Sequence, residues 1–285
     1  PPQSLTETIA EDDAEIKAYL QTHFYNYEEF ASPPANFDFK IDIDTIAGDN
    51  AGKTALADQV SAHIVNVSST DLGLELEEIN VPHTMYYLTA NEGGGMNPTQ
   101  VDSVYLRYEG SLLNGSVFDS STGSPIWFDL QGTLTQGNSG VIRGFKEGLP
   151  NFKSGGNIVD NDDGTFVVED YGVGLLIIPS GLAYFSGTQV GPSYSPIIFK
   201  VELLVSNTAD HDRDGVPTIE EDLDGDKNPV DDDTDEDGLP NYLDTDDDGD
   251  DISTKDEISD EAGNIIFPYP DSDGNGIPDY LQPNS

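Results

Sequence analysis

The sequence predicts an α+β protein in which an antiparallel sheet packs on one short helix, and three observations support this prediction. Between residues 101 and 205, apolar residues recur along short segments that turn signals such as Asn114-Gly115 separate, as in half-buried strands. Only the stretch from Ile142 to Leu149 in this region has helical character. After Asn207, Asp and Gly dominate and apolar residues become sparse, so the sheet is expected to end there.

These changes of pattern predict three regions: a small helix-plus-strand region over 1–84, a sheet domain over 85–206, and an irregular Asp-rich segment over 207–285. The first region predicts one helix, with Thr8 and Glu11 at the spacing of a capping box. Its apolar face would hold Ile16, Tyr19, Leu20 and Phe24. Strands are expected over 37–44, where Phe and Ile alternate with polar residues, and at His63–Val67 and Leu74–Ile79. No catalytic pattern occurs in this region, and packing is its simplest interpretation.

The sheet domain contains three clear strand patterns. Val104, Leu106 and Tyr108 alternate on one face of 101–108, and 175–178 and 197–205 are apolar, β-branched runs. The only Trp, Trp127, alternates with Ile126 and Phe128 and is expected on the opposite face of its strand.

Composition excludes several classes of function. The 285 residues carry a formal net charge of -44, which disfavours nucleic acid as a partner because phosphates are bound by Lys and Arg. The absence of cysteine excludes disulfides, thiolate metal sites and a Cys nucleophile. No run of about 18–20 apolar residues predicts a membrane helix. A charge of this size opposes compaction unless cations neutralise it or part of the chain is disordered.

The Asp-rich segment repeats the spacing of a calcium-binding loop. Such a loop places oxygen ligands at positions 1, 3 and 5, a backbone carbonyl at 7 and a carboxylate at 12, with glycine at 6 for the sharp bend. The predicted ligands are Asp210, Asp212, Asp214, Val216 and Glu221; Asp233, Asp235, Asp237, Leu239 and Asp244; Asp246, Asp248, Asp250, Ile252 and Glu257; and Asp271, Asp273, Asn275 and Asp279. Asp222, Asp224 and Asp226 form a poorer set, because Lys227 stands at the glycine position; Asp251 does so in the third set.

The alternative interpretation is a solvated, disordered acidic tail, but a random tail would not keep this phase. Residues 210–281 resemble thrombospondin type-3 repeats and related calcium loops of bacterial surface proteins. The resemblance implies a chain wrapped around several structural Ca²⁺ ions with little regular secondary structure. Asp160, Asp162 and Asp163, outside this segment, are expected to be a solvated hairpin tip.

Three motifs of the sheet domain occur together in a fixed order: residues 105–121 (YLRYEGSLLNGSVFDSS), residues 141–148 (VIRGFKEG), and Leu182-Ala-Tyr184 followed by Phe199–Leu204. The ordered set resembles the FKBP-type peptidyl-prolyl cis-trans isomerases. The resemblance implies an antiparallel half-barrel wrapped on one short helix, with an apolar pocket between them. Residues 156–173 would then be an insertion in a connection that is usually tight.

The resemblance also assigns the pocket. Its residues would be Tyr108, Phe118, Asp119, Ile126, Phe128, Val141, Ile142, Phe145, Tyr184 and Phe199. Phe145 would form the floor where the family usually has Trp, Ile126 would replace an aromatic residue, and Asp119 and Tyr184 would supply the polar groups. From the residues alone, each single aromatic residue is better explained as part of a strand core than as part of a site, and only the whole set favours the pocket.

These inferences favour an exported isomerase and folding helper that acts on X–Pro bonds of polypeptide clients and needs no cofactor for catalysis. The alternatives are a non-catalytic module for Pro-containing segments or surface assembly, and a purely structural calcium protein. A macrolide of the FK506 type would bind the same pocket. Calcium loops suit an exported protein, which predicts the periplasm, outer membrane or cell surface of a Gram-negative bacterium. A membrane tether would come from an N-terminal lipid upstream of Pro1, as in envelope lipoproteins.

Overall fold

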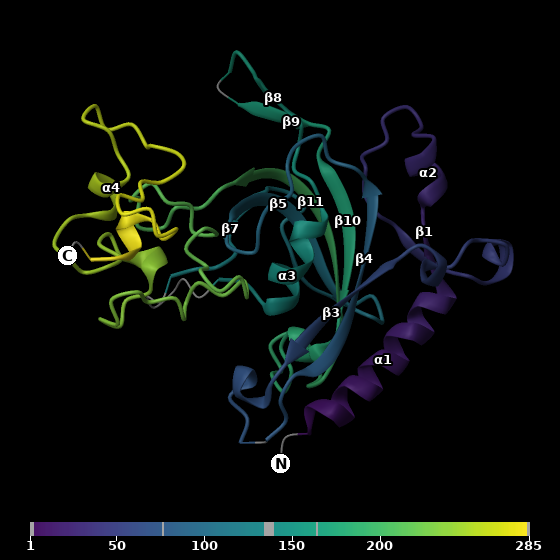
Figure 1. Cartoon of the computed structure of the whole chain (residues 1–285). Coiled ribbons are helices and arrows are strands. Elements are labelled where there is room, and N and C mark those ends of the chain that lie inside the picture. Colours follow the sequence, from purple (N-terminus) through teal and green to yellow (C-terminus); the bar gives the residue numbers. More distant parts are fainter. Residues whose placement is uncertain (1–2, 76, 134–139, 164, 284–285) are drawn as a thin grey trace. The chain divides into compact units, whose positions relative to one another are not determined.

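The computed structural model describes residues 3–75, 77–133, 140–163 and 165–283, and it divides the chain into two compact units (Figure 1). The first unit comprises Pro1–Pro98, Val104–Phe128 and Val141–Ser206. The second comprises Thr99–Ser103, Asp129–Gly140 and Asn207–Ser285. The expected boundary near residue 84 is therefore absent, and the expected boundary at 207 is only part of the division.

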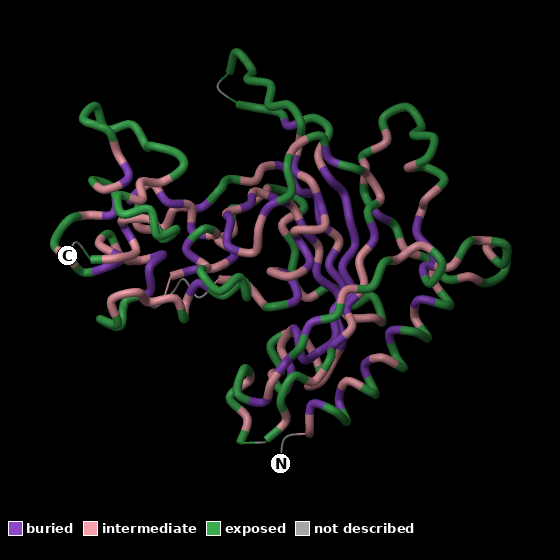
Figure 2. The backbone as a smooth tube through the Cα atoms, in the orientation of Figure 1, coloured by how far each residue is buried: buried purple, intermediate pink, exposed green. Residues whose placement is uncertain are grey.

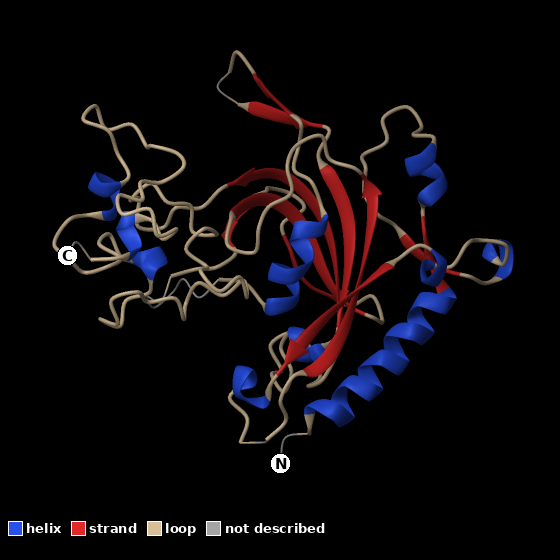
Figure 3. Ribbon diagram, in the orientation of Figure 1, coloured by secondary structure: helices blue, strands red, loops and turns tan. Residues whose placement is uncertain are grey.

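The first unit is built on a seven-stranded sheet with the strand order β3-β4-β10-β11-β5-β6, in which β7 also pairs with β5. The pairs β3–β4, β4–β10, β10–β11 and β5–β6 are antiparallel. The strands are β3 (Ser61–Val67), β4 (Val81–Asn91), β5 (Ser103–Leu112), β6 (Val117–Ser120), β7 (Ile126–Asp129), β10 (Gly172–Ile178) and β11 (Ile197–Asn207). They curve around the short helix α3 (Arg143–Gly148), so the predicted α+β half-barrel is confirmed (Figure 3).

Strand β10 shows why the N-terminal region belongs to the same unit. All its residues are buried, and its alternate side chains point to opposite faces of the sheet (Figure 2). Leu176 and Ile178 face α3, where an added Cβ at Gly148 or Gly144 would collide with them. Leu175 and Ile177 form a core cluster with Ile16 and Leu20 of helix α1 (Leu5–Thr22). Helix α1 and neighbouring parts of the N-terminal region therefore cover the second face of the sheet.

Three sequence-based expectations for the N-terminal region were wrong. Helix α1 begins after Ser4, whose side chain accepts a hydrogen bond from the Glu7 amide, so Thr8 and Glu11 form no capping box. Of the strand predicted over 37–44, only the end is a strand: β2 (Ile43–Thr45) pairs with β1 (His23–Tyr25). Phe39 has a φ of 56°, which breaks the alternation.

The described residues of Leu74–Ile79 also form no strand. Glu78 instead accepts hydrogen bonds from the Leu5 and Thr6 amides at 2.7 and 3.0 Å. Its carboxylate thus lies at the N-terminus of α1, where a negative charge is favourable. The other short elements of this unit are α2 (Tyr27–Ala31) and the 3₁₀ turns Gly48–Asn50, Leu56–Asp58, Ser69–Leu72, Leu149–Asn151 and Ser180–Leu182.

The expected insertion after α3 is a two-stranded hairpin, β8 (Asn157–Asp160) and β9 (Phe166–Glu169). It forms a sheet separate from the seven-stranded one. Among the helices that the structure describes, none combines the length and the apolar character that crossing a membrane requires.

The second unit has little regular structure, as the sequence predicts. Its only helical elements in the described residues are α4 (Thr254–Glu257) and the 3₁₀ turns Asn241–Leu243 and Asp279–Leu281. A small core of Val216, Ile258 and Tyr280 holds it together. Asp102, from far upstream, accepts a hydrogen bond from the Ala209 amide through its side chain and one from the Leu130 amide through its backbone carbonyl. The Asp-rich segment is thus integrated with two upstream stretches of the chain.

Candidate active site and cation loops

Six aromatic side chains from five elements meet on the face of the sheet that holds α3. Tyr108 lies on β5, Phe118 on β6, Phe128 on β7, Phe145 on α3 and Phe199 on β11, while Tyr184 follows the turn Ser180–Leu182. Each ring lies 5.0–6.4 Å from at least one other in the set. The structure therefore brings together the six aromatic residues that the sequence resemblance assigned to one pocket, which we call the aromatic site.

Phe145 lies at the centre of the aromatic site, as expected for its floor. Its ring contacts those of Tyr108, Phe128 and Phe199, and it is buried. Phe118, Phe128 and Tyr184 are half-buried and form the open side. Gly110 is required behind the rings, because a Cβ there would lie 2.7 Å from both Phe118 and Phe199.

The polar groups of the aromatic site are a phenol pair and one carboxylate. Tyr108 donates a hydrogen bond of 2.5 Å to the exposed Asp119 carboxylate. Burial, together with this hydrogen bond, raises the pKa of the Tyr108 phenol, so it remains a neutral donor at physiological pH. Burial also raises the pKa of Tyr184, and the charge of Asp119 adds to the effect. The hydroxyl of Tyr184 is therefore a neutral donor as well.

The three remaining predicted pocket residues lie at the edges. Ile142 is the residue that precedes the first turn of α3, and its carbonyl accepts hydrogen bonds from the Phe145 and Lys146 amides. Val141 and Ile142 are half-buried. Ile126 is 37% exposed and shares a face of β7 with Phe128. Trp127 points the opposite way, as predicted, and its ring lies 5.1 Å from that of Tyr105.

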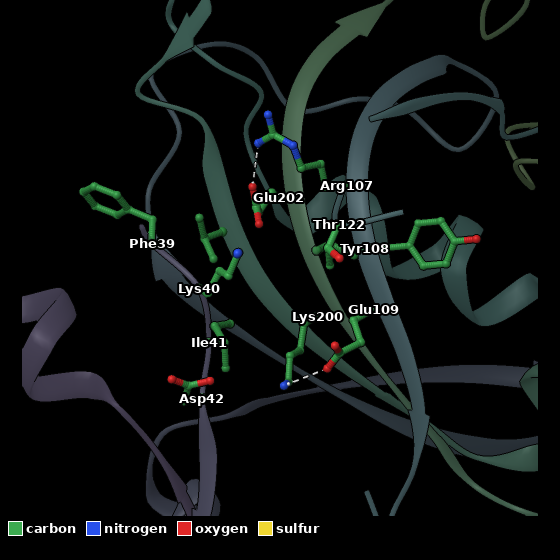
Figure 4. Close-up of a pocket in the computed structure, with 12 residues that line it drawn as sticks. Phe39, Lys40, Ile41, Asp42, Arg107, Tyr108, Glu109, Thr122, Lys200 and Glu202 are labelled. Atoms are coloured by element: carbon green, nitrogen blue, oxygen red, sulfur yellow. Dashed lines mark hydrogen bonds and ion pairs between the residues drawn. The ribbon is translucent and has the colours of Figure 1, made fainter. Parts of the chain in front are cut away.

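A cavity lies on the opposite face of the sheet, and sequence reasoning did not predict it (Figure 4). It has a volume of about 90 Å³ and is bounded by the segment 39–42 and by outward-facing residues of β5 and β11. The ion pairs Arg107–Glu202 and Lys200–Glu109, at 2.8 and 3.0 Å, lie along it. The four charged residues that β5 and β11 contribute to its lining are paired with one another, which favours packing between the N-terminal region and the sheet over ligand binding.

The cation loops of the second unit share one backbone geometry. They start at residues 210, 222, 233, 246 and 271, and position 4 has a positive φ in all five: Arg213 (69°), Gly225 (76°), Glu236 (60°), Gly249 (69°) and Gly274 (73°). Position 6 does too: Gly215 (108°), Lys227 (73°), Gly238 (96°), Asp251 (72°) and Gly276 (94°). Lys227 and Asp251 thus adopt the left-handed conformation at position 6, where the loop motif calls for glycine.

Hydrogen bonds inside the loops repeat in the same way. The amide at position 5 donates to the side chain at position 3 in every loop. The amide at position 2 donates to the side chain at position 9, which is Thr218, Asn241, Thr254 or Asp279. Sequence reasoning missed position 9, although a polar residue recurs there in the loops starting at 210, 233, 246 and 271, seven residues after position 2. Asp279 was predicted as a ligand, but Ser272 occupies both its oxygens with hydrogen bonds of 2.7 and 2.6 Å.

The structure gathers most predicted ligands into four groups whose carboxylate oxygens lie within 4.8 Å of one another. The groups are Asp212, Asp214, Glu221 and Asp247; Asp222, Asp224 and Asp232; Asp233, Asp235 and Asp237; and Asp246, Asp248 and Asp250. Asp232 and Asp247 were not predicted as ligands, because Asp232 lies at position 11 of its loop, where the motif assigns no ligand, and Asp247 belongs to the loop that starts at 246. Asp210, Asp226, Asp244, Glu257, Asp271 and Asp273 belong to none of the groups within the described residues.

The first group, which we call the buried quartet, places four carboxylates close together in a buried space. Glu221 and Asp247 are at most 1% exposed, and neither carboxylate oxygen of either residue has a hydrogen-bond partner among the described residues. Burial and the neighbouring carboxylates raise the pKa of Glu221 to about 10, and those of Asp212 and Asp247 to about 8. Four such groups cannot all ionise in this space unless a cation joins them.

Comparison with known proteins separates the same two regions. Residues 94–159 match the sequence model of the FKBP-type peptidyl-prolyl cis-trans isomerase family, and residues 211–270 match one described as BamM C-terminal. The chain is 35% identical over 123 residues to the FKBP-type isomerase FkpA of Escherichia coli, which covers 42% of this chain and 37% of FkpA. It is 33% identical over 127 residues to the isomerase Mip of Coxiella burnetii, covering 42% and 44%. The matches thus span less than half of either relative.

Two solved structures of peptidyl-prolyl isomerases are also similar to parts of this chain. The crystal structure of Escherichia coli FkpA has a TM-score of 0.36 at 25% identity and covers 71% of this chain and 62% of that one. A peptidyl-prolyl isomerase from Pseudomonas syringae has a TM-score of 0.33 at 28% identity, covering 43% and 75%. The family match over residues 94–159 and the sequence identities show that the chain contains a region similar to the FKBP-type peptidyl-prolyl cis-trans isomerase family.

Proposed function

We propose that the first unit catalyses cis–trans isomerisation of X–Pro bonds in polypeptide clients. The observation that supports this most directly is the aromatic site itself. Six rings from distant elements converge there, with Phe145 beneath them and two neutral phenols beside them. No nucleophile or metal is required, since no covalent bond is made or broken.

The chemistry follows from the barrier to be lowered. Resonance holds the peptide bond planar, and rotation costs about 18–20 kcal/mol. An apolar surface disfavours the charge-separated resonance form of the amide, so it binds the twisted bond better than either planar form. The rings of Tyr108, Phe128, Phe145 and Phe199 would hold the proline ring. The Tyr184 hydroxyl and the Ile142 amide would bind the flanking carbonyls, and Asp119 would fix the orientation of Tyr108.

An exchange assay by NMR on a short X–Pro peptide tests this proposal. Phe145→Ala should lower kcat/KM about tenfold or more, which corresponds to about 1.4 kcal/mol in the barrier. Because Phe145 is buried, Tyr184→Phe is the companion variant, as it removes one half-buried hydroxyl and leaves the ring. Ile64→Ser, an exposed substitution on β3, should keep the full rate. A wild-type protein that binds the peptide without accelerating exchange would instead be a binding module.

We further propose that the second unit binds several structural Ca²⁺ ions. Calcium takes 6–8 oxygen ligands at about 2.3–2.6 Å, and the four groups of clustered carboxylates offer only oxygens. The unpartnered oxygens of the buried quartet support a cation there most strongly. The predicted carbonyl ligands of Val216, Leu239 and Ile252 would complete three of the loops. The likeness to thrombospondin type-3 repeats remains a prediction.

A matched pair of variants tests the calcium proposal. Asp247→Asn removes one charge from the buried quartet, and Glu261→Gln removes one from an exposed site. Calorimetric titration with Ca²⁺ should show at least one site weakened about 10–100-fold in Asp247→Asn, comparable with losses at other metal sites. The Glu261→Gln protein should titrate like the wild type. Equal titrations of all three proteins would rule out a cation in the quartet.

We also propose export of the protein to the periplasm, outer membrane or cell surface of a Gram-negative bacterium. Calcium sites of moderate affinity suit compartments in which the free ion is abundant. A lipid anchor and macrolide binding remain predictions. Cell fractionation with antibody detection checks the location, and recovery only with cytoplasmic markers would contradict it.

A further inference from the structure

The first unit has a second apolar surface, outside the aromatic site. The rings of Tyr105 on β5 and Trp127 on β7 lie 5.1 Å apart, and Phe166 of β9 lies 6.1 Å from Tyr105. Trp127 is 51% exposed and Phe166 is 47% exposed. Ile158 of β8 is also exposed and, by register, shares a face of the hairpin with Phe166. We call Tyr105, Trp127, Ile158 and Phe166 the hairpin patch.

The hairpin of β8 and β9 exposes apolar side chains on both faces. Ile158 and Phe166 lie on one face with the buried Val168, while Val159 and Val167 are exposed on the other. Among the described strands, β8 and β9 pair only with each other, so their outer edges keep free backbone groups. Such an edge accepts a further strand, and a two-stranded hairpin alone is only marginally stable. Figure 1 shows the hairpin projecting beyond the strands of the main sheet.

The hairpin patch is continuous with the aromatic site through one strand. Ile126 and Trp127 are neighbours on β7, both exposed, and their side chains leave opposite faces. Ile126 lies on the face of Phe128, and Trp127 lies on the face of Tyr105. A chain that leaves the aromatic site would therefore pass around β7 to reach the hairpin patch, with the exposed Ile126 and Trp127 as apolar contacts on the two faces.

The charges beside the hairpin patch restrict the partner further. Asp160, Asp162 and Asp163 lie at the exposed hairpin tip, and Glu169 and Asp170 lie at its base. The neighbouring cation Arg107 is already paired with Glu202. Local charge is thus negative, which favours an apolar segment that also carries Lys or Arg.

We propose that the hairpin patch binds an extended, apolar and basic segment of the same client whose X–Pro bond occupies the aromatic site. The segment would pair with an outer edge of the hairpin, and its alternate side chains would contact Trp127 and Phe166. This inference rests on the proposed isomerase function. It assigns to the inserted hairpin the selection of unfolded, strand-forming clients over short peptides.

The protein carries its own probe, because Trp127 is its only tryptophan. The experiment uses two peptides: a short X–Pro tetrapeptide, and a longer one in which the same tetrapeptide is followed by alternating Val and Lys. The longer peptide should shift Trp127 emission to the blue and protect it from acrylamide, and the tetrapeptide should not. An unchanged spectrum at saturating long peptide would overturn the proposal, whether or not the tetrapeptide is isomerised.

Variants then locate the effect. Phe166→Ser should weaken binding of the longer peptide about tenfold, as for a central aromatic contact, and leave the tetrapeptide rate unchanged. Ile64→Ser, which is also exposed but lies on β3, should change neither. A loss of both activities in Phe166→Ser would mean that the hairpin supports the aromatic site. A blue shift that depends on protein concentration alone would identify a second copy as the occupant and exclude the client.

Discussion

The two units of this protein hold their structures by opposite means. In the first, β10 is buried on both faces, between α1 on one side and α3 on the other. In the second, the apolar cluster in the described residues joins only Val216, Ile258 and Tyr280, and buried carboxylates lie near it. One unit is stabilised by removing apolar surface from water, whereas the proposed calcium binding would make the other depend on cations to neutralise its charge. Conditions that change ion supply should therefore affect them unequally.

Removal of calcium should have the largest effect, and it should destabilise the second unit far more than the first. With EDTA, the amides of residues 210–281 should lose protection from hydrogen exchange, because the buried quartet cannot stay ionised without a cation. The amides of β4, β10 and β11 should keep theirs. Small-angle scattering should show a larger radius of gyration. Equal protection with and without EDTA would contradict this dependence on calcium.

A cavity in the apolar core should give the next largest effect. Leu175 is fully buried in the cluster that joins α1 to the sheet, so Leu175→Ala should lower the free energy of unfolding of the first unit by about 2–5 kcal/mol. Urea titration followed by amide signals of β10 would measure it. The loss should be the same at saturating and at low calcium. A strong dependence on calcium would instead show that the two modes of stabilisation are coupled.

The smallest effect concerns one carboxylate inside the apolar unit. Burial raises the pKa of Asp12 to about 6, although Ser180 donates hydrogen bonds of 2.7 and 2.8 Å to it. Because this pKa lies above the unfolded value of 3.8, protonation stabilises the fold, and that stability is lost as the pH rises through 6. Relative to Asp12→Asn, the wild type should gain about 1–3 kcal/mol between pH 7 and pH 4.

Parallel urea titrations of the two proteins over this pH range cancel the contribution of the shared carboxylates in the second unit. A constant difference between the two proteins would show that Asp12 has an ordinary pKa.

The sequence predicted the fold where one physical signal dominated. The apolar runs of β10 and β11 and the ordered motifs placed the sheet, α3 and the aromatic site correctly. Prediction failed where neighbours decided the conformation. Phe39 turns into the left-handed region while its ring packs on those of Phe30 and Phe37, and Glu78 leaves the predicted strand to bind the first turn of α1.

Prediction of some cation-loop ligands failed for the same reason. Periodicity along the chain identified the loops but not Asp247, which belongs to the loop starting at 246 and joins the carboxylates of the loop starting at 210. Such ligands depend on how loops pack, and spacing along one loop carries no information about that. The hairpin patch was missed for a related reason: the alternation placed Trp127 outward, but only the fold brings Phe166 beside Tyr105.

The second unit includes chain segments from within the first, so joining two genes at a single boundary would not produce it. Its members include Asp102 and Leu130, encoded within the isomerase region, and Asp102 is buried where the Ala209 amide reaches it. A gene that ended near codon 206 would leave that carboxylate without one of its donors and Leu130 without its surroundings. The Asp-rich segment therefore does not form a unit that could be removed on its own. Its gain or loss in a lineage would require matching substitutions at positions 99–103 and 129–140, which makes those two short stretches the place to look for covariation with the tail.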